Sequence, residues 1–117
     1  MLSQVHNLLG LAQRAGKIVS GEESVENALR KGKVRMLILA EDASANTSKL
    51  FNNLTKTVGV PLFVHGTKLE LGLAIGKSHR SAIAITDINF VRGIKGHLVD
   101  FNNTLSKQSG TENMGVD

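Results

Sequence analysis

The chain reads Lys17-Ile-Val-Ser-Gly-Glu-Glu-Ser-Val-Glu-Asn-Ala-Leu-Arg-Lys-Gly32 near its N-terminus, and Val34-Arg-Met-Leu-Ile-Leu-Ala40 follows almost at once. The first segment predicts a short strand, a tight entry at Gly21, a helix with polar residues at its exposed start, and a stop at Gly32. The second segment is an apolar run of the length typical of a buried strand. Strand, helix and strand in this order indicate one βαβ unit.

The start of the helix in this unit is a candidate binding site. The first backbone N–H groups of a helix have no partner within it, so they are free to bind an anion. We expect Arg14, Lys17 and Arg30 to lie beside these groups and to add positive charge. Nucleic acid is therefore the first candidate partner. A basic cluster at the end of the same helix, where cations also complement the helix dipole, comprises Arg30, Lys31, Lys33 and Arg35.

The composition bounds the class of protein. A chain of 117 residues with 41% hydrophobic residues has the size of one compact domain, which we expect to be monomeric. The absence of cysteine excludes disulfides and thiolate chemistry and suits the cytoplasm. No apolar run approaches a membrane span, and the N-terminus lacks the pattern of a signal peptide, so we expect no membrane partner. A net charge of +4 fits a polyanion, while the aromatic residues, four Phe, are too few for a base-stacking platform.

Helical and strand periodicities predict the remaining elements. One helix opens with a capping box, Thr67-x-x-Glu70. Strands that are apolar throughout and alternate with helices predict an α/β sandwich, whose mostly parallel sheet is covered on both faces. The polar composition of residues 102–117 indicates a flexible tail after a domain of residues 1–101. We expect helices at 3–15, 47–58, 67–76 and 89–101 and strands at 60–64 and 81–86.

Two motifs that resemble catalytic or phosphate-binding sites do not meet the requirements of those sites. Gly76-Lys-Ser78 is similar to the end of a phosphate-binding P-loop, but it closes a helix where a P-loop opens one, so we interpret Gly76 as a helix cap. Glu41 and Asp42 follow a strand as a carboxylate pair, yet adjacent side chains point in different directions and make a poor acid–base couple. We therefore expect no catalytic residue, no cofactor and no enzymatic activity.

The histidines and one further motif have structural interpretations. The four histidines lack metal-ligand spacing, so we expect no metal site. We expect His6 on the exposed side of the first helix, and His79, in a basic loop, either contacts RNA or is solvated. Ser20-x-x-Glu23 matches a capping box, which would give both residues a structural role worth about 1 kcal/mol.

Six blocks of this sequence occur in the same order in a known family. They are Leu8-Leu-Gly-Leu-Ala-Gln-Arg-Ala-Gly-Lys17, Val19-Ser-Gly-Glu-Glu23, Leu37-Ile-Leu-Ala-Glu-Asp-Ala-Ser44, Val60-Pro-Leu, Leu71-Gly-x-Ala-x-Gly-Lys77 and Ala82-Ile-Ala-Ile-Thr-Asp87. On these residues the chain resembles the kink-turn RNA-binding family of ribosomal proteins seven-Ae and thirty-e over about residues 4–92, and it is most similar to the small bacterial members of the YlxQ type. The resemblance implies a three-layer α-β-α sandwich around a four-stranded mixed sheet. It also implies binding to RNA that is bent at tandem sheared G·A pairs.

The same resemblance implies roles for individual residues. The helix that begins near Gly21 would enter the RNA groove with its first turn, and a basic residue one turn further on would meet a phosphate. The loop at residues 77–82 would pack against nucleotides extruded from the bend. The candidate RNA-binding residues are Arg14, Lys17, Gly21, Glu22, Glu23, Ser24, Asn27, Arg30, Lys31, Lys77, Ser78, His79, Arg80 and Ser81.

This sequence departs from the usual family motif, Gly-x-Asn-Glu-x-x-Lys, in the stretch that begins at Gly21. Glu23 stands at the Asn position, Ser24 at the Glu position and Asn27 at the Lys position. A carboxylate at Glu23 accepts from a guanine edge but repels phosphate, and Asn27 lacks the charge of lysine. Binding of structured RNA in a ribosome- or translation-related assembly is the first hypothesis. The alternatives are a protein–protein adaptor that has lost kink-turn binding and an RNA-docking partner of an RNA-modifying enzyme.

Overall fold

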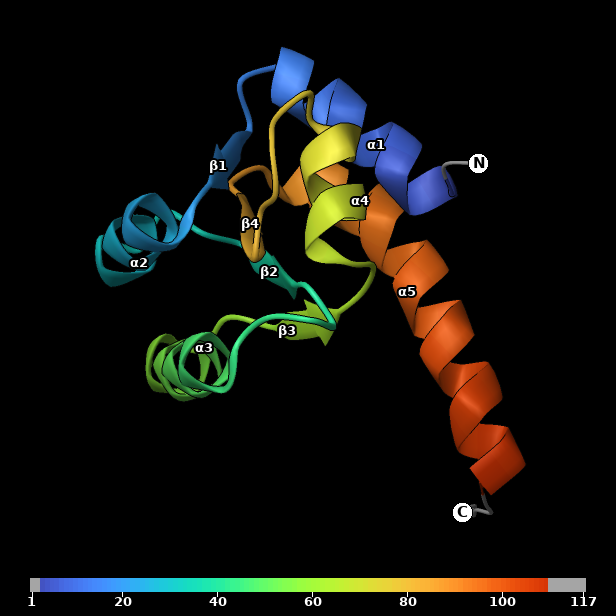
Figure 1. Ribbon diagram of the computed structural model, residues 1–117. Coiled ribbons are helices and arrows are strands. Elements are labelled where there is room, and N and C mark those ends of the chain that lie inside the picture. The colour runs from blue at the N-terminus through green and yellow to red at the C-terminus, as the bar shows by residue number, and fades with distance from the viewer. Residues whose placement is uncertain (1–2, 110–117) are drawn as a thin grey trace.

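The computed structural model describes residues 3–109, and the side chains through residue 98. Every predicted element is present, although the strand expected at 60–64 begins after Pro61. No helix in this part of the chain is long and apolar enough to cross a membrane. The elements are α1 (Gln4–Arg14), β1 (Ile18–Ser20), α2 (Glu22–Arg30), β2 (Met36–Leu39), α3 (Ala45–Val58), β3 (Leu62–Val64), α4 (Lys68–Ala74), β4 (Ala82–Ile85) and α5 (Ile88–Ser109) (Figure 1).

The four strands form one mixed sheet in the order β1-β4-β2-β3. β4 runs antiparallel to both of its neighbours, and only β2 and β3 pair in parallel. The expectation of a mostly parallel sheet was therefore wrong, whereas the mixed sheet implied by the family resemblance is confirmed. β4 also separates β1 from β2, so the predicted βαβ unit does not join neighbouring strands. Local patterns missed this arrangement because the strand that completes the sheet comes from a distant part of the chain.

Helices cover both faces of the sheet and make three layers (Figure 1). Leu37 and Leu39 of β2 pack with α2 and α3, while Met36 and Ile38 point to the opposite core beneath α1, α4 and α5. β4 alternates in the same way, and every residue of both strands is buried. Burial on two sides explains why these strands are apolar at each position. The predicted α-β-α sandwich is confirmed.

Three helices end in the same hydrogen-bonded motif, in which a glycine is followed by a lysine. After α2, the N–H groups of Gly32 and Lys33 donate to carbonyl oxygens of the last turn at 3.1 and 3.0 Å. This is the Schellman pattern, and α1 and α4 end in it too. The residue after the glycine is a lysine with an exposed side chain beside the helix C-terminus in each motif, namely Lys17, Lys33 and Lys77.

The two predicted capping boxes have different outcomes. The box at the start of α4 is confirmed, because the Thr67 hydroxyl accepts from the Glu70 N–H at 3.1 Å and the Glu70 carboxylate accepts from the Thr67 N–H at 2.9 Å. The prediction of a capping box at Ser20 and Glu23 is wrong. Ser20 is the last residue of β1, and Gly21 is the N-cap of α2 with no side chain bound to it.

His6 is buried, contrary to the expectation of an exposed position. Its side chain is only 5% exposed because the connection between β3 and α4 crosses it, and a Cβ at Gly66 would lie 3.3 Å from His6 Nε2. Its ring meets His65 edge-on, with the centroids 5.3 Å apart. Among the described residues neither ring nitrogen of His6 has a hydrogen-bond partner.

Burial favours the neutral form of both histidines. Desolvation lowers the pKa of His6, and the neighbouring His65 lowers it further. Desolvation also lowers the pKa of His65, although the carboxylates of Glu70 and Glu41 oppose the shift.

The final helix, α5, packs as predicted but continues further along the chain. Val91, Ile94 and Leu98 lie in the core, which confirms a packed helix. The backbone remains helical to Ser109, because the sequence contains no glycine or proline between Gly96 and Gly110 that would stop it. Residues 110–117 lie outside the described residues, so the flexible tail and the boundary at residues 101 and 102 stay predictions.

The burial of His6 and His65 predicts that acid destabilises the fold. Both pKa values are lowered in the folded chain, so the unfolded chain binds more protons as the pH falls through about 6.5. We expect the urea midpoint to decrease between about pH 7.5 and about pH 5.5 and His6→Phe to weaken this dependence. His79→Phe, in an exposed loop, is the matched control and should retain the wild-type dependence. An equal change in both variants would contradict the assignment.

Candidate nucleic-acid interface

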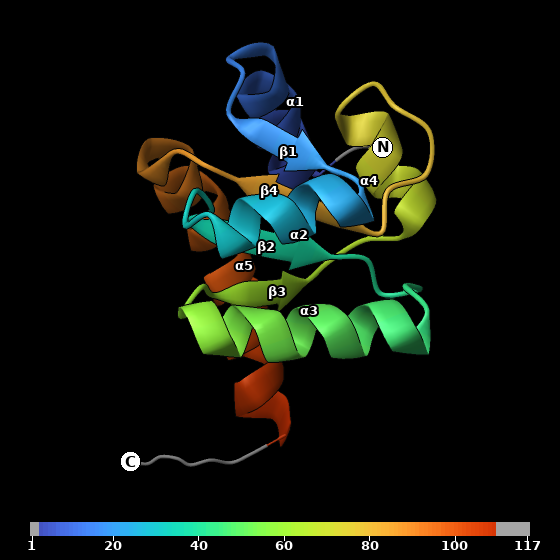
Figure 2. The same ribbon diagram turned by 90° about the vertical axis from the view of Figure 1, so that its left-hand side faces the viewer.

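Two segments far apart in the sequence meet where β1 ends. One comprises Gly21 and the first turns of α2, and the other is the α4–β4 connection at residues 77–81. Figure 2 shows the start of α2, the start of α3 and this connection on the same side of the molecule. Arg80 joins the two segments, because its Nε donates to the Ser20 hydroxyl at 3.1 Å. The structure thus brings together the two parts that the resemblance assigned to one RNA site.

The start of α2 presents backbone donors without a side-chain cap. Gly21, the N-cap, has φ 92° and ψ 143°, a conformation that other residues rarely adopt. The first intrahelical hydrogen bond runs from the Val25 N–H to the Gly21 carbonyl at 2.9 Å. No side chain caps the helix, so its first turn retains N–H groups that can donate to a ligand.

The polar side chains at this helix start differ in their surroundings. Glu22 accepts a hydrogen bond from the Thr47 hydroxyl at 2.8 Å and thereby ties α2 to the first turn of α3. The side chains of Glu23, Ser24 and Asn27 are exposed, and the described residues give them no hydrogen-bond partner. Glu23 and Asn27 are four residues apart, so they share one face of the helix. These three side chains are available to a ligand, whereas Glu22 is engaged in the fold.

Gly72, which the sequence did not single out as a positioning residue, sets the path of the α4–β4 connection. A Cβ at this position would lie 1.9 Å from the carbonyl oxygen of Ser78, so only glycine allows the connection to pass this close to α4. The signal was present in the sequence, because Gly72 belongs to the block Leu71-Gly-x-Ala-x-Gly-Lys77 that carries the family resemblance. Gly76 does close α4, as expected, with φ 71°.

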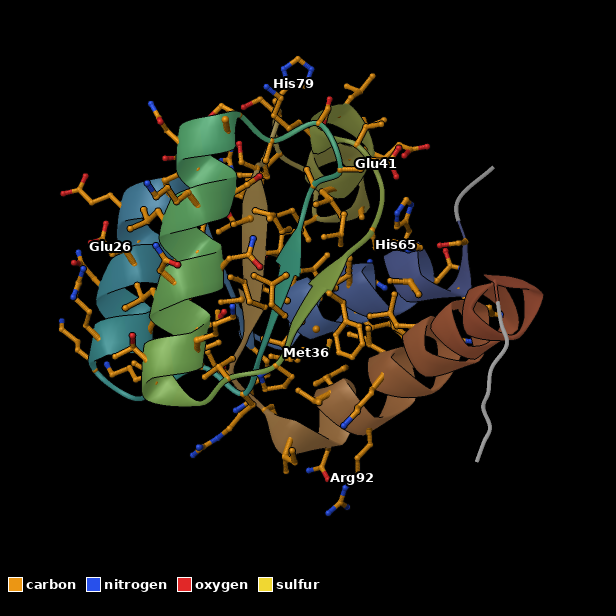
Figure 3. The ribbon with its side chains drawn as sticks, turned by 90° about the horizontal axis from the view of Figure 1, so that it is seen from below. Glu26, Met36, Glu41, His65, His79 and Arg92 are labelled. Carbon is orange, nitrogen blue, oxygen red and sulfur yellow. The ribbon has the colours of Figure 1, made fainter. Side chains whose placement is uncertain are left out.

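Arg80 holds the α4–β4 connection in place. Besides Ser20, its guanidinium donates to the Ser78 hydroxyl at 3.1 Å and to the His79 carbonyl at 2.9 Å. The Ser81 carbonyl accepts from the Ala40 N–H at 2.8 Å, which fixes the other end of the connection. The imidazole of His79 projects away from the body of the protein (Figure 3). Lys77, Ser78 and His79 are exposed, whereas Arg80 is half-buried.

Two of the basic residues expected beside the start of α2 lie elsewhere. Lys17 precedes β1 and Gly21 follows it, so their backbones are about 13 Å apart. Arg30 ends α2, about 12 Å from its first turn, and pairs with Glu26 at 2.8 Å. The expectation that Lys17 and Arg30 lie beside the helix start was therefore wrong, whereas that for Arg14, which ends α1, stays a prediction. Their contact with RNA, and that of Lys31, stays a prediction.

Acidic residues outnumber basic ones around the candidate interface. The connections at this end of the sheet and the first turn of α2 contain two basic and four acidic residues, an excess of two negative charges. Asp42 is engaged, because its carboxylate accepts from the Lys68 N–H at 2.7 Å. The charged residues counted are Lys77, Arg80, Glu22, Glu23, Glu41 and Asp42.

Within residues 3–109, no three histidine or acidic side chains are arranged to hold a metal ion.

Comparisons with known proteins identify relatives over most of the chain. Residues 3–92 match the ribosomal protein L7Ae/L30e/S12e/Gadd45 family. The RNA-binding protein YlxQ of Bacillus subtilis is 41% identical over 83 residues, which cover 71% of this chain and 83% of that protein. The protein of the same name from Enterococcus faecium is 37% identical, with 76% and 85% coverage. A solved structure from Bacillus halodurans, described as a protein with unknown function, has a TM-score of 0.77 at 37% identity, with 83% and 97% coverage.

The close approach at Gly72 predicts a position-specific loss of stability. Gly72→Ala forces the backbone of α4 away from the α4–β4 connection at Ser78. We expect it to lower the free energy of unfolding by about 1–3 kcal/mol. Gly93→Ala is the matched control, because its Cβ would meet only the Leu8 side chain at an ordinary 3.7 Å. The control should leave stability unchanged or raise it by up to about 1 kcal/mol through helix propensity. Urea unfolding measures both effects, and equal stabilities of the two variants would refute the positioning role.

Proposed function

The chain belongs to the ribosomal protein L7Ae/L30e/S12e/Gadd45 family, and from this membership and the geometry of the α2 start we propose that it binds structured, kink-turn-like RNA. It does so without catalysis, as a component of ribosome- or translation-related assemblies. The name of the relatives, RNA-binding protein, supports the class of partner. The ribosomal members in the family's description support the proposed setting.

The uncapped start of α2, held beside the α4–β4 connection, is the observation that carries this proposal. Its first-turn N–H groups can donate to RNA acceptors, and the nearby side chains of Glu23, Ser24 and Asn27 can accept or donate at base edges. The Arg80–Ser20 hydrogen bond fixes the second segment against the first. A bent RNA presents a groove and extruded nucleotides together, so two fixed segments suit it better than one helix start alone.

The charge around this site specifies how such recognition would work. An excess of two negative charges disfavours close approach of phosphates, so binding energy at this end must come from hydrogen bonds to bases and sugars. The carboxylate of Glu23 accepts from donors, and the guanine amino group is such a donor on a base edge. We therefore propose that the α2 start reads guanines and contributes little to phosphate binding.

The same excess of acidic residues favours a second candidate function. A protein–protein adaptor would retain the fold and the exposed polar face of α2 while it contacts a basic partner. Retention of protein partners after nuclease treatment, without measurable RNA binding by the purified chain, would establish this function in place of the first.

A single charge at the α2 start tests the RNA site without weakening the helix. Ser24→Asp adds a carboxylate in the first turn, which favours the helix dipole but repels RNA. We expect affinity for a kink-turn RNA to fall at least about tenfold, or about 1.4 kcal/mol. Fluorescence anisotropy measures this, with the same RNA lacking its tandem G·A pairs as the specificity control.

Gln4→Glu is the matched protein control for Ser24→Asp. It places the same charge in the exposed first turn of α1, away from the two segments that form the candidate interface. We expect it to retain wild-type affinity. Equal losses in both variants would show a general effect of charge, and an unchanged affinity of Ser24→Asp would place the RNA elsewhere.

A further inference from the structure

Exposed basic side chains gather at the end of the sheet opposite the candidate interface. At this end β1 and β2 begin and β4 stops, and the connections into and out of these strands carry the charges. Figure 3 shows the side chain of Arg92 at one end of the molecule and that of His79 at the other. We call this surface the basic edge. Its exposed cations are Lys17, Lys31, Lys33, Arg35 and Arg92.

Backbone hydrogen bonds hold the basic edge together around the end of β4. The Arg35 N–H donates to the Ile85 carbonyl at 2.8 Å, and the Lys17 carbonyl accepts from the Thr86 N–H at 3.0 Å. Lys17 and Arg35 therefore flank β4 on its two sides, with their backbones about 10 Å apart across two strand spacings. Segments from three parts of the chain thus present their cations in a fixed arrangement.

The basic edge accounts for the net charge of the whole protein. Among the described residues of the connections at this end and of α5 as far as Arg92, Asp87 is the only acidic one. Five basic residues and this one acidic residue give a charge of +4, which equals the net charge of the chain. Asp87 offsets one of these positive charges, because one of its carboxylate oxygens accepts from the Asn89 N–H at 2.7 Å and the other lies 3.9 Å from Lys17 Nζ.

Helix dipoles explain only part of this arrangement. Lys17, Lys31 and Lys33 follow helix C-termini, where a cation is favourable. Arg35 precedes a strand, and Arg92 lies near the N-terminal end of α5, where the helix dipole gives a cation no advantage. Stabilisation of the fold therefore does not account for the presence of all five cations.

We propose that the basic edge is a second RNA-binding surface, which takes the phosphate backbone of duplex RNA and lets the protein bridge two RNA segments. Duplex RNA fits better than a single strand, because the described part of the edge offers no exposed aromatic ring for stacking. Phe51 is buried, and Phe63 and Phe90 pack against the core. The candidate interface and the basic edge lie on opposite ends of the sheet, so one RNA helix at each end can be bound together.

Salt-dependent binding of a fully paired duplex without a kink-turn tests the second surface. We expect Lys33→Gln/Arg35→Gln to weaken duplex binding and to reduce the slope of log affinity against log salt by about two, since each phosphate contact contributes about 0.9. Lys49→Gln/Lys68→Gln removes the same charge from the starts of α3 and α4 and is the matched control, expected to keep most of the slope. Equal losses in the two variants, or no duplex binding by the wild type, would overturn the proposal.

Bridging of two RNA segments requires a separate measurement. The same measurement distinguishes the effect of the basic edge from that of the α2 site. With kink-turn RNA immobilised, wild-type protein should recruit a labelled duplex, and Lys33→Gln/Arg35→Gln should weaken recruitment while preserving discrimination of the tandem G·A pairs. Ser24→Asp should impair that discrimination and leave binding of the duplex alone unchanged. If polyglutamate displaced the duplex at equal charge and salt, the edge would be a general polyanion site and the proposed duplex preference would be wrong.

Discussion

Insertion of β4 between β1 and β2 is the constraint on which the rest of the structure depends. Its four residues are buried on both faces and pair with a neighbour on each side. Where β4 begins, the α4–β4 connection is brought against Ser20 and the start of α2. Where it ends, its backbone bonds to Lys17 and Arg35. One buried strand therefore positions both the polar surface and the basic edge, and it sets the distance between them.

In the proposed mode of RNA binding, the two surfaces divide between them the tasks of reading bases and binding phosphates. Hydrogen-bonding groups that can read bases lie at the acidic end, and the cations that can neutralise phosphate lie at the other end of the sheet. Base contacts specify a sequence or shape, whereas phosphate contacts provide affinity that depends on salt. The departures at Glu23 and Asn27 from the usual family motif are consistent with this division, because the first adds a negative charge to the reading surface and the second removes a positive one, while both side chains can still form hydrogen bonds.

Sequence patterns predicted the elements well because each pattern reflects local burial. The apolar stripes of the helices, the glycine after α2 and the box at Thr67 are short-range features, and the structure bears them out. The order of the strands, the burial of His6 and the cap of α2 depend on segments distant in sequence, so local patterns misjudged them. The candidate site shows the same limit: its parts were named from sequence, but Gly72 and the bond from Arg80 to Ser20 emerge only in three dimensions.

The placement of charge has a consequence for how affinity and specificity combine. Two weak surfaces on a rigid scaffold bind one folded RNA more tightly than either binds alone, because the second contact forms at a high effective concentration. The gain vanishes when the RNA cannot reach both surfaces at once. β4 is buried and pairs with a strand on each side, so it holds the α2 start and the basic edge at a set separation. If both surfaces bind RNA as proposed, an RNA with suitable spacing between its bend and its second helix would thus be selected by geometry, in addition to any bases that Glu23, Ser24 and Asn27 contact.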